Sequence, residues 1–124
     1  MDKKIEKLQE NIVPASNQNK GSFFPRDEAT GDGLKILFVG NSITKHAPKA
    51  DIGWFGDWGM AATSLENDYV HKTMSKIREI RQGCGFAMLQ VAEYERQFYT
   101  LHPSDVYKAA KDYRPDIVVM FFGA

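Results

Sequence analysis

The chain has 124 residues, in which 16 basic side chains balance 16 acidic ones. This length allows at most one small domain, and an apolar fraction of 43% is ordinary for a soluble globular protein. A net charge of zero gives no long-range field toward nucleic acid or a membrane surface, so we expect neither as a partner. The only cysteine, Cys84, excludes an internal disulfide, and the charged segment 1–10 does not resemble a signal peptide, which together favour the cytoplasm.

Residues 1–33 are predicted to form an N-terminal arm that precedes a single domain at 34–124. The spacing of apolar residues predicts a short helix over 3–11, and the polar residues 14–22 are typical of a loop. The segment 23–25, Phe-Phe-Pro, is too apolar for a linker, so we expect it to lie against the domain. The alternative is that this segment contacts a second subunit.

An apolar run and a small polar turn organise the rest of the chain. Residues 34–39 (Leu-Lys-Ile-Leu-Phe-Val) predict a buried strand of a parallel sheet, which ends at Gly40. Open α/β sheets bind ligands outside the carboxyl ends of their strands, so Ser42 lies where chemistry would be done. The alternative is a plain turn in which Asn41 and Ser42 only cap the next element.

A loop rich in aromatic residues follows at 45–62. Its centre places Trp54, Phe55 and Trp58 among three glycines, which is unusual for a solvated loop. These rings either pack over the edge of the sheet or wall a pocket beside Ser42, where flat faces would suit a sugar ring or an acyl chain. On the second interpretation Asn41, Trp54, Asp57 and Trp58 are the candidate pocket residues.

Two further helix–strand pairs are predicted after this loop. A capping-box pattern from Thr63 to Glu66 predicts a helix that runs to about residue 82. His71 lies inside this helix, and we expect it on the surface or in packing rather than in catalysis. A strand is predicted at 86–91, a helix from about 102 to 113, and a third, fully apolar strand at 117–122. The apolar face of the first helix is expected to comprise Leu65, Tyr69, Val70, Met74, Ile77 and Ile80.

This order of elements predicts an α/β fold with a parallel sheet, because strand–helix–strand units form crossover connections. We expect the strand order 2-1-3, with the strand at 34–39 in the centre. The outer edge of the strand at 117–122 would then be unpaired. We therefore expect self-association, or association with a missing C-terminal part of the chain.

The pentapeptide Gly40-Asn41-Ser42-Ile43-Thr44, following an apolar strand, resembles the first block of the SGNH hydrolases, also called the GDSL esterase/lipase family. The resemblance implies a flavodoxin-like three-layer sandwich in which Ser42 is the nucleophile. It also implies that the backbone amide of Ser42 and an amide after the second strand form part of the oxyanion hole. The family's second block is usually Asn-x-Gly, and this chain has Gln90-Val91-Ala92, so the amide of Ala92 takes that role.

The later blocks of the family are not found in the chain. The third block is usually Gly-x-Asn-Asp, and this sequence ends at Gly123-Ala124. The family's catalytic histidine lies three residues after an aspartate near the C-terminus of the protein, and that part is missing here. Neither His46 nor His102 follows such an Asp-x-x-His pattern. The resemblance therefore implies the N-terminal half of a hydrolase, truncated after the third strand and inactive by itself.

The function expected from these features is a serine esterase that hydrolyses a small acyl ester. The aromatic loop favours an O-acetylated carbohydrate as substrate, and neither a metal nor a cofactor is expected. One alternative is a flavodoxin-like binding module in which the turn at 40–44 holds a phosphate or a flavin. The other is a non-catalytic fragment that acts by assembling with another chain.

Overall fold

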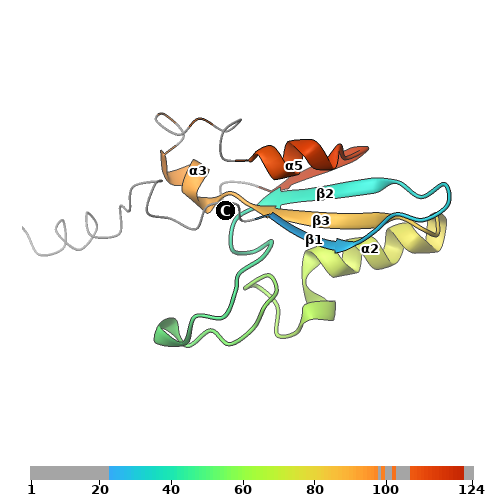
Figure 1. The fold of residues 1–124 in the computed structure, drawn as a ribbon. Helices are drawn as coiled ribbons and strands as arrows, with labels where there is room; N and C mark the ends of the chain where they lie inside the picture. The colour runs from blue at the N-terminus through green and yellow to red at the C-terminus, as the bar shows by residue number, and fades with distance from the viewer. Residues whose placement is uncertain (1–22, 98, 100–101, 103–106, 122–124) are drawn as a thin grey trace, which may run out of the picture.

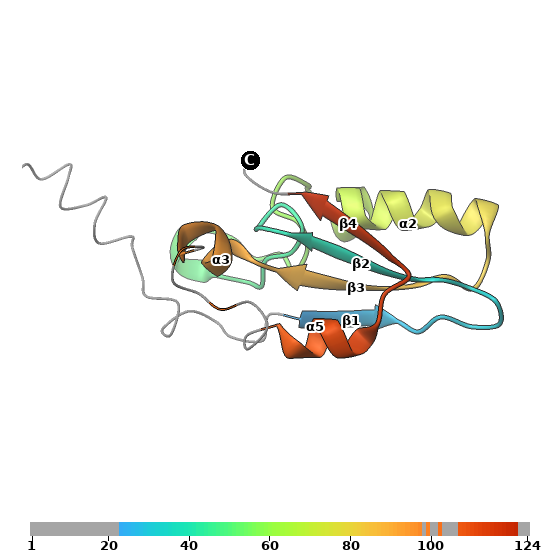
Figure 2. The same ribbon diagram turned by 90° about the horizontal axis from the view of Figure 1, so that it is seen from above.

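A computed structural model of the chain describes residues 23–97, 99, 102 and 107–121. Its centre is one sheet of the strands β1 (Phe23–Asp27), β2 (Lys35–Gly40), β3 (Gly85–Gln90) and β4 (Ile117–Phe121). Figure 1 shows the sheet from its side, and Figure 2 shows the strand order β1-β3-β2-β4. The strand β2 pairs in parallel with β3 on one side and with β4 on the other, whereas β1 pairs with β3 in antiparallel orientation.

The predicted α/β class is confirmed, but the predicted sheet of parallel strands in the order 2-1-3 is wrong as a description of the whole sheet. The three predicted strands do pair in parallel around β2. The fourth strand, β1, falls within the predicted arm at 1–33 and makes the sheet mixed. Pro25 argues against a strand in the sequence, because proline is tolerated only at a sheet edge or at a bulge. In the structure β1 is an edge strand, and its register shifts between Pro25 and Asp27. Our predictions for residues 1–22 lie outside the described part of the chain.

Helices lie on both faces of the sheet (Figures 1 and 2). The helix α2 (Tyr69–Ile80) covers one face, α5 (Lys108–Tyr113) lies on the other, and the short α3 (Ala92–Gln97) directly follows β3. The cluster on the α2 side contains Ile36, Phe38, Val70, Met74, Cys84, Phe86 and Met88. The cluster on the α5 side contains Leu37, Val39, Ala87, Leu89, Val91 and Ala110. The alternating residues of β2 and β3 thus contribute to both clusters, as a strand covered on both faces requires.

The helix α2 begins later than predicted. A single 3₁₀ turn, η3 (Leu65–Asn67), occupies the predicted first turn, and α2 begins after Asp68, whose side chain accepts the backbone N–H of His71 at 2.8 Å. The predicted capping box is therefore wrong, and Asp68 is the cap. The predicted apolar face is also too long, because the side chains of Leu65 and Ile80 are exposed.

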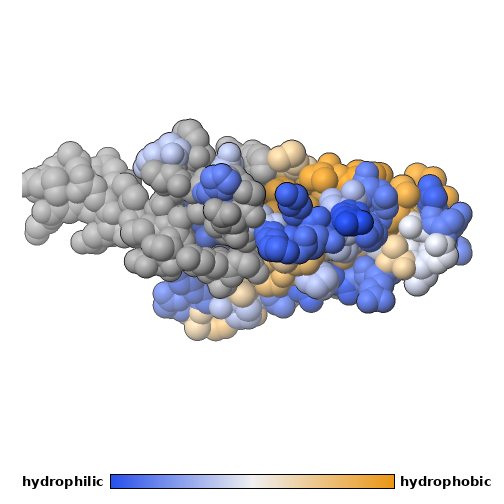
Figure 3. Space-filling view, turned by 45° about the horizontal axis from the view of Figure 1, so that its top comes forward, coloured by the Kyte–Doolittle hydropathy of each residue, from blue (hydrophilic) through white to orange (hydrophobic). Residues whose placement is uncertain are grey.

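The edge strand β4 is much less buried than its composition predicted. Asp116 fixes its start on both sides of the backbone of Lys35: its carboxylate accepts the Lys35 N–H at 2.8 Å, and its own N–H donates to the Lys35 carbonyl at 2.7 Å. Beyond it, Ile117 and Phe121 are more than two-fifths exposed, and Met120 is 62% exposed. Its apolar composition alone therefore does not decide its burial: among the residues that the structure describes, β4 has a neighbouring strand on only one side. Figure 3 shows exposed apolar residues gathered in one patch.

Cys84 lies buried where β3 begins, and its Sγ accepts the backbone N–H of Leu34 at 3.4 Å. It belongs to the α2-side cluster, so the thiol is part of the packed interior. Among the residues that the structure describes, no helix is long and apolar enough to span a membrane.

Candidate functional site

The turn that follows β2 is shaped by Asn41, which is buried. The side-chain Oδ1 of Asn41 accepts the N–H of Ile43 at 3.0 Å, which is an Asx turn. Its backbone carbonyl accepts the N–H groups of Thr44 and Lys45, at 3.0 and 3.3 Å. Asn41 therefore holds the turn together, and three consecutive amides after Ser42 donate within it.

Gly40 and Thr44 fix this turn against the sheet. A Cβ atom at position 40 would clash with Oγ1 of Thr44 and with the carbonyl oxygen of Phe121, so only glycine fits. The side chain of Thr44 is fully buried and shares a short hydrogen bond with the hydroxyl of Tyr69 in α2. Gly40, Asn41 and Thr44 of the block at 40–44 thus each have a structural role.

Ser42 differs from these residues. It is partly exposed, and its carbonyl accepts the N–H of Met60 at 2.9 Å. Within the described part of the chain, neither its hydroxyl nor its own amide makes a hydrogen bond. The turn therefore presents the hydroxyl and the amide of Ser42 at the carboxyl edge of the sheet, and neither group stabilises the turn.

The predicted second oxyanion donor lies on the neighbouring strand end. The N–H of Val91 donates to the carbonyl of Gly40 at 2.7 Å, so the segments that leave β2 and β3 run side by side. The amide of Ala92 donates to Oε1 of Gln90 at 2.9 Å. This amide would become available to a ligand only after the Gln90 side chain turns away.

The aromatic loop is organised around the two predicted tryptophans. The rings of Trp54 and Trp58 meet edge to face with centroids 5.5 Å apart, and a Cβ on the buried Gly56 would clash with both. Their indole N–H groups donate to backbone carbonyls of His46 and Ala62, at 3.0 and 2.8 Å. The two half-buried tryptophans are therefore packed against each other, which leaves their ring faces for contact with a ligand, whereas the third predicted aromatic residue of the loop, Phe55, is 76% exposed.

Asp57 connects this loop to the sheet. It forms an ion pair with Lys45, whose side chain is only 2% exposed, and a longer contact of 3.5 Å with Arg26 of β1. The Lys45 ammonium also lies 4.9 Å from the ring centroid of Phe24. Partial burial would raise the pKa of the Asp57 carboxyl, but the hydrogen bond and charge of Lys45, with those of Arg26, outweigh it and lower the pKa. Asp57 thus has a structural role besides its predicted place in a pocket.

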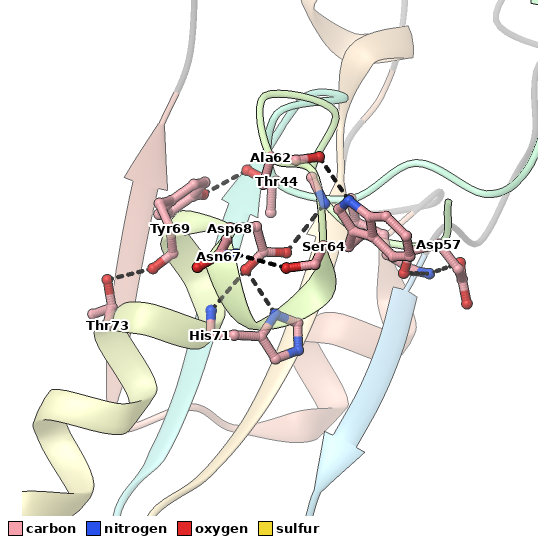
Figure 4. A network of polar contacts seen from close by, with 12 residues as sticks. Thr44, Asp57, Ala62, Ser64, Asn67, Asp68, Tyr69, His71 and Thr73 are labelled. Carbon is pink, nitrogen blue, oxygen red and sulfur yellow. Dashed lines mark hydrogen bonds and ion pairs between the residues drawn. The ribbon is translucent and has the colours of Figure 1, made fainter. Parts of the chain in front are cut away.

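Sequence analysis missed a buried aspartate–histidine pair at the start of α2 (Figure 4). The carboxylate of Asp68, 1% exposed, accepts Nδ1–H of His71 at 2.7 Å as well as the His71 backbone N–H. Its second oxygen accepts the N–H of Gly59 at 3.1 Å. Asp68 and His71 have the Asp-x-x-His spacing, so the signal for this pair is present in the sequence.

Asp68 links the aromatic loop to the helix and, through one further residue, to the candidate nucleophile. It holds Gly59, the next residue Met60 donates to the carbonyl of Ser42, and Gly59 is packed so closely on Ile43 that a Cβ would clash with the Ile43 carbonyl. Burial alone would raise the pKa of the Asp68 carboxyl, but the hydrogen bonds from His71 and Gly59 and the His71 charge lower it below the usual value.

The structure does not bring a histidine to Ser42 among the residues it describes. Nδ1 of His46 contacts the carbonyl of Ala47 at 2.6 Å, and the ring of His71 lies against Phe86 with centroids 5.5 Å apart. In the described ranges, no group of three or more His, Cys, Asp or Glu side chains is placed to hold a metal ion.

Comparison with known proteins adds no relative: no family model matches the chain, and neither a curated protein nor a solved structure matches it.

Proposed function

We propose that this chain carries the nucleophile turn of an SGNH-type serine hydrolase, and that Ser42 is the nucleophile. The observation that supports this best is the contrast within the block at 40–44. Gly40, Asn41 and Thr44 are each required by the packing or hydrogen bonds of the turn, whereas the Ser42 hydroxyl has no such role. A hydroxyl held at the carboxyl end of a central strand is where an α/β sheet places reacting groups.

Acyl transfer by this serine needs a base for its proton and donors for the oxyanion. The Ser42 amide is the first donor, and the Ala92 amide is the second once Gln90 releases it. The base must come from outside the described residues, as the resemblance to the family implies. The flavodoxin-like arrangement of helices on both sides of the parallel strands is part of the same proposal.

The alternative of an anion-binding turn is less well supported. Binding a phosphate requires several backbone N–H groups that point outward together. In this turn the amides of Ile43, Thr44 and Lys45 all donate to Asn41, so these three N–H groups are not available to a phosphate.

For the substrate we propose a small acyl ester, with an O-acetylated carbohydrate favoured by the aromatic loop. The indole N–H groups of Trp54 and Trp58 are already bonded, so these residues would contact a sugar through their ring faces. Asn41 and Asp57 hold the turn and the loop, so their contribution to a pocket is to position these neighbours.

The test is Ser42→Ala in the full-length natural protein, assayed with a small aryl acetate. We expect the rate to fall by about 10³-fold or more, because a nucleophile that acts within a catalytic unit is lost. The matched control is Ser75→Ala, which removes an exposed hydroxyl from α2. If the Ser42 variant folds, as circular dichroism will show, and keeps more than a tenth of the activity, Ser42 is not the nucleophile.

The same assay separates substrate recognition by the loop from packing. Trp54→Ala and Trp58→Ala are expected to raise KM for an acetylated sugar more than KM for the aryl acetate. Equal effects on both substrates, together with a lower melting temperature, would assign the two rings to packing alone.

A further inference from the structure

The ends of β2 and β3 are closed by hydrogen bonds of the same kind. The two strands end in register, with Gly40 opposite Gln90. After β2, Oδ1 of Asn41 accepts the N–H of Ile43 at 3.0 Å. At the end of β3, Oε1 of Gln90 accepts the N–H of Ala92 at 2.9 Å. In each case a side-chain carboxamide oxygen accepts the backbone N–H two residues further along the chain, so the two strand ends can be compared directly.

The two carboxamides differ in how firmly the structure holds them. Asn41 is buried, and its backbone carbonyl accepts two more N–H groups of the turn. Gln90 is partly exposed, and within the described part of the chain its side chain makes one hydrogen bond, that to Ala92. A glutamine side chain also has one more rotatable bond than an asparagine side chain. The Asn41 side chain is therefore part of the turn, whereas the Gln90 side chain is free to turn into solvent.

The Ala92 amide lies directly beyond the backbone pairing of β2 with β3, at the end of the sheet where α3 begins (Figure 1). This pairing continues to Val91, whose N–H donates to the carbonyl of Gly40 at 2.7 Å. The next N–H, that of Ala92, has the Gln90 side chain as its acceptor instead of a backbone carbonyl. A ligand oxygen that displaces Gln90 therefore exchanges one hydrogen bond for another and leaves no amide unsatisfied.

We propose that Gln90 gates the oxyanion hole: its carboxamide oxygen occupies the Ala92 N–H while the site is empty, and the oxyanion of the reaction displaces it. This inference rests on the proposed function, in which Ser42 is the nucleophile and Ala92 is an oxyanion donor. Gln90 acts through the Ala92 amide and does not itself touch the substrate. It is thus a positioning residue whose contact inhibits the resting site.

The strength of the acceptors decides when the gate opens. A carboxamide oxygen is a stronger acceptor than an ester carbonyl oxygen, because the amide nitrogen releases more electron density to it. When Oγ of Ser42 bonds to the carbonyl carbon, the hydroxyl proton goes to the base and the π electron pair of the C=O bond moves to the oxygen. A hydrogen bond to this oxyanion is roughly twice as strong as one to a neutral acceptor. The oxyanion therefore displaces Gln90 more readily than the bound ester does.

This gate has a measurable cost for any ligand that needs the Ala92 amide. The apparent affinity of such a ligand is lowered by the fraction of molecules in which the amide is open. Removing the competing oxygen should therefore raise the affinity by about 3- to 10-fold, which is the contribution of one neutral hydrogen bond. If Gln90 only held the amide in place, the same change would lower the affinity. The direction of the effect thus separates the two roles.

The experiment uses the full-length natural protein, a small aryl acetate as substrate and an alkylboronic acid as inhibitor. A boronic acid adds the serine oxygen and becomes a tetrahedral anion, so it resembles the acceptor that displaces Gln90. Gln90→Met, which has a side chain of similar length without the oxygen, should raise kcat/KM and the affinity for the boronic acid together, by about 3- to 10-fold. Gln90→Glu supplies a charged and stronger acceptor, and should lower both by about tenfold or more.

The control and a direct readout accompany these variants. Gln82→Met and Gln82→Glu change an exposed glutamine that precedes β3, and should alter neither quantity. The bond itself is followed through the Ala92 amide proton in isotope-labelled protein, because its chemical shift moves downfield as its acceptor becomes stronger. We expect a downfield shift when the boronic acid binds the wild type, and an upfield shift in the free Gln90→Met variant.

Three results would overturn the inference while the proposed function stands. They are a lower kcat/KM in a folded Gln90→Met variant, an unchanged kcat/KM in Gln90→Glu, and an Ala92 amide proton that does not move when the boronic acid binds. If Gln90→Met does not fold, the other two results decide, because Gln90→Glu retains an oxygen acceptor for Ala92. Failure of the proposed function is a different result: Ser42→Ala would keep its activity, and the inference on Gln90 would fall with it.

Discussion

Asp68→Asn tests whether one buried carboxylate holds the aromatic loop on the helix. Asparagine has nearly the same shape and caps helices equally well, so its remaining oxygen can keep the bond to the His71 backbone N–H. Its amide nitrogen, however, meets the Gly59 N–H in place of an acceptor, and leaving a buried N–H unsatisfied costs about 1–3 kcal/mol. The bond to the His71 ring also loses its ionic character, which costs about 1 kcal/mol more.

The variant should therefore lose about 2–4 kcal/mol at pH 7, a large part of the 5–15 kcal/mol typical of a whole domain. The pH dependence has a defined sign. The pKa of the Asp68 carboxyl is lower in the folded chain than its ordinary value of 3.8, so its contribution is fully present above that value. It is lost as the pH falls through the folded pKa. The difference between wild type and variant should be constant near neutrality and shrink below about pH 4.

The measurement is urea unfolding followed by tryptophan fluorescence, at one protein concentration and at several pH values from 3 to 7. Asp112→Asn is the control, because that carboxylate belongs to an exposed ion pair with Lys108 and should contribute less than about 0.5 kcal/mol. The reasoning is refuted if Asp68→Asn unfolds within about 0.5 kcal/mol of the wild type at pH 7. It is equally refuted if the difference stays constant down to pH 3.

Two further predictions concern the turn and the loop. Gly40→Ala should lower the free energy of unfolding in urea by about 3 kcal/mol or more, because the added Cβ would overlap Thr44. The control Gly31→Ala, at φ +56° in open space, should lower it by about 1 kcal/mol, and equal losses for the two variants would show that the turn can move aside. Asp57→Asn should lower the melting temperature more than Lys45→Met does. Asp57→Asn leaves the buried Lys45 ammonium without its counter-ion, whereas Lys45→Met leaves the half-exposed Asp57 carboxylate in contact with water. A larger loss for Lys45→Met would refute this.

The elements that sequence analysis placed correctly are those whose signal is local. The apolar run at 34–39 and the glycine after it predict a buried strand and a turn without reference to the rest of the chain. The turn at Asn41 is equally local, because its oxygen atoms accept the N–H groups of three nearby residues, Ile43, Thr44 and Lys45. These features carry most of the candidate site.

The predictions are wrong where residues distant in the sequence determine the local structure. Thr63 and Asp68 are both good helix caps, and the choice depends on Gly59, whose N–H lies against the Asp68 carboxylate. Pro25 argues against a strand in isolation, yet the exposed edge of β3 accepts one. The burial of β4 depends on what lies beside it, and its own apolar sequence does not contain that information.

The candidate site shows the same division. The position of Ser42 at a strand end follows from local pattern, but the bond between the Ala92 amide and the Gln90 side chain depends on side-chain geometry that spacing does not predict. The position of His71 inside a helix predicts a place on the surface or in packing, whereas its spacing from Asp68 indicates the pair that the structure shows.

The buried thiol of Cys84 can report local opening of the sheet, because chemical labelling of the thiol requires access to it. A reagent that attacks thiols reaches Cys84 only when the packing around the start of β3 opens, because the residue is 2% exposed and packs between Leu34 and the α2-side cluster. Cys84 is the only cysteine in the sequence, so the labelling rate can be assigned to one position without mutagenesis. Under conditions where closing outpaces labelling, that rate gives the free energy of local opening around Cys84, at the end of the sheet remote from Ser42.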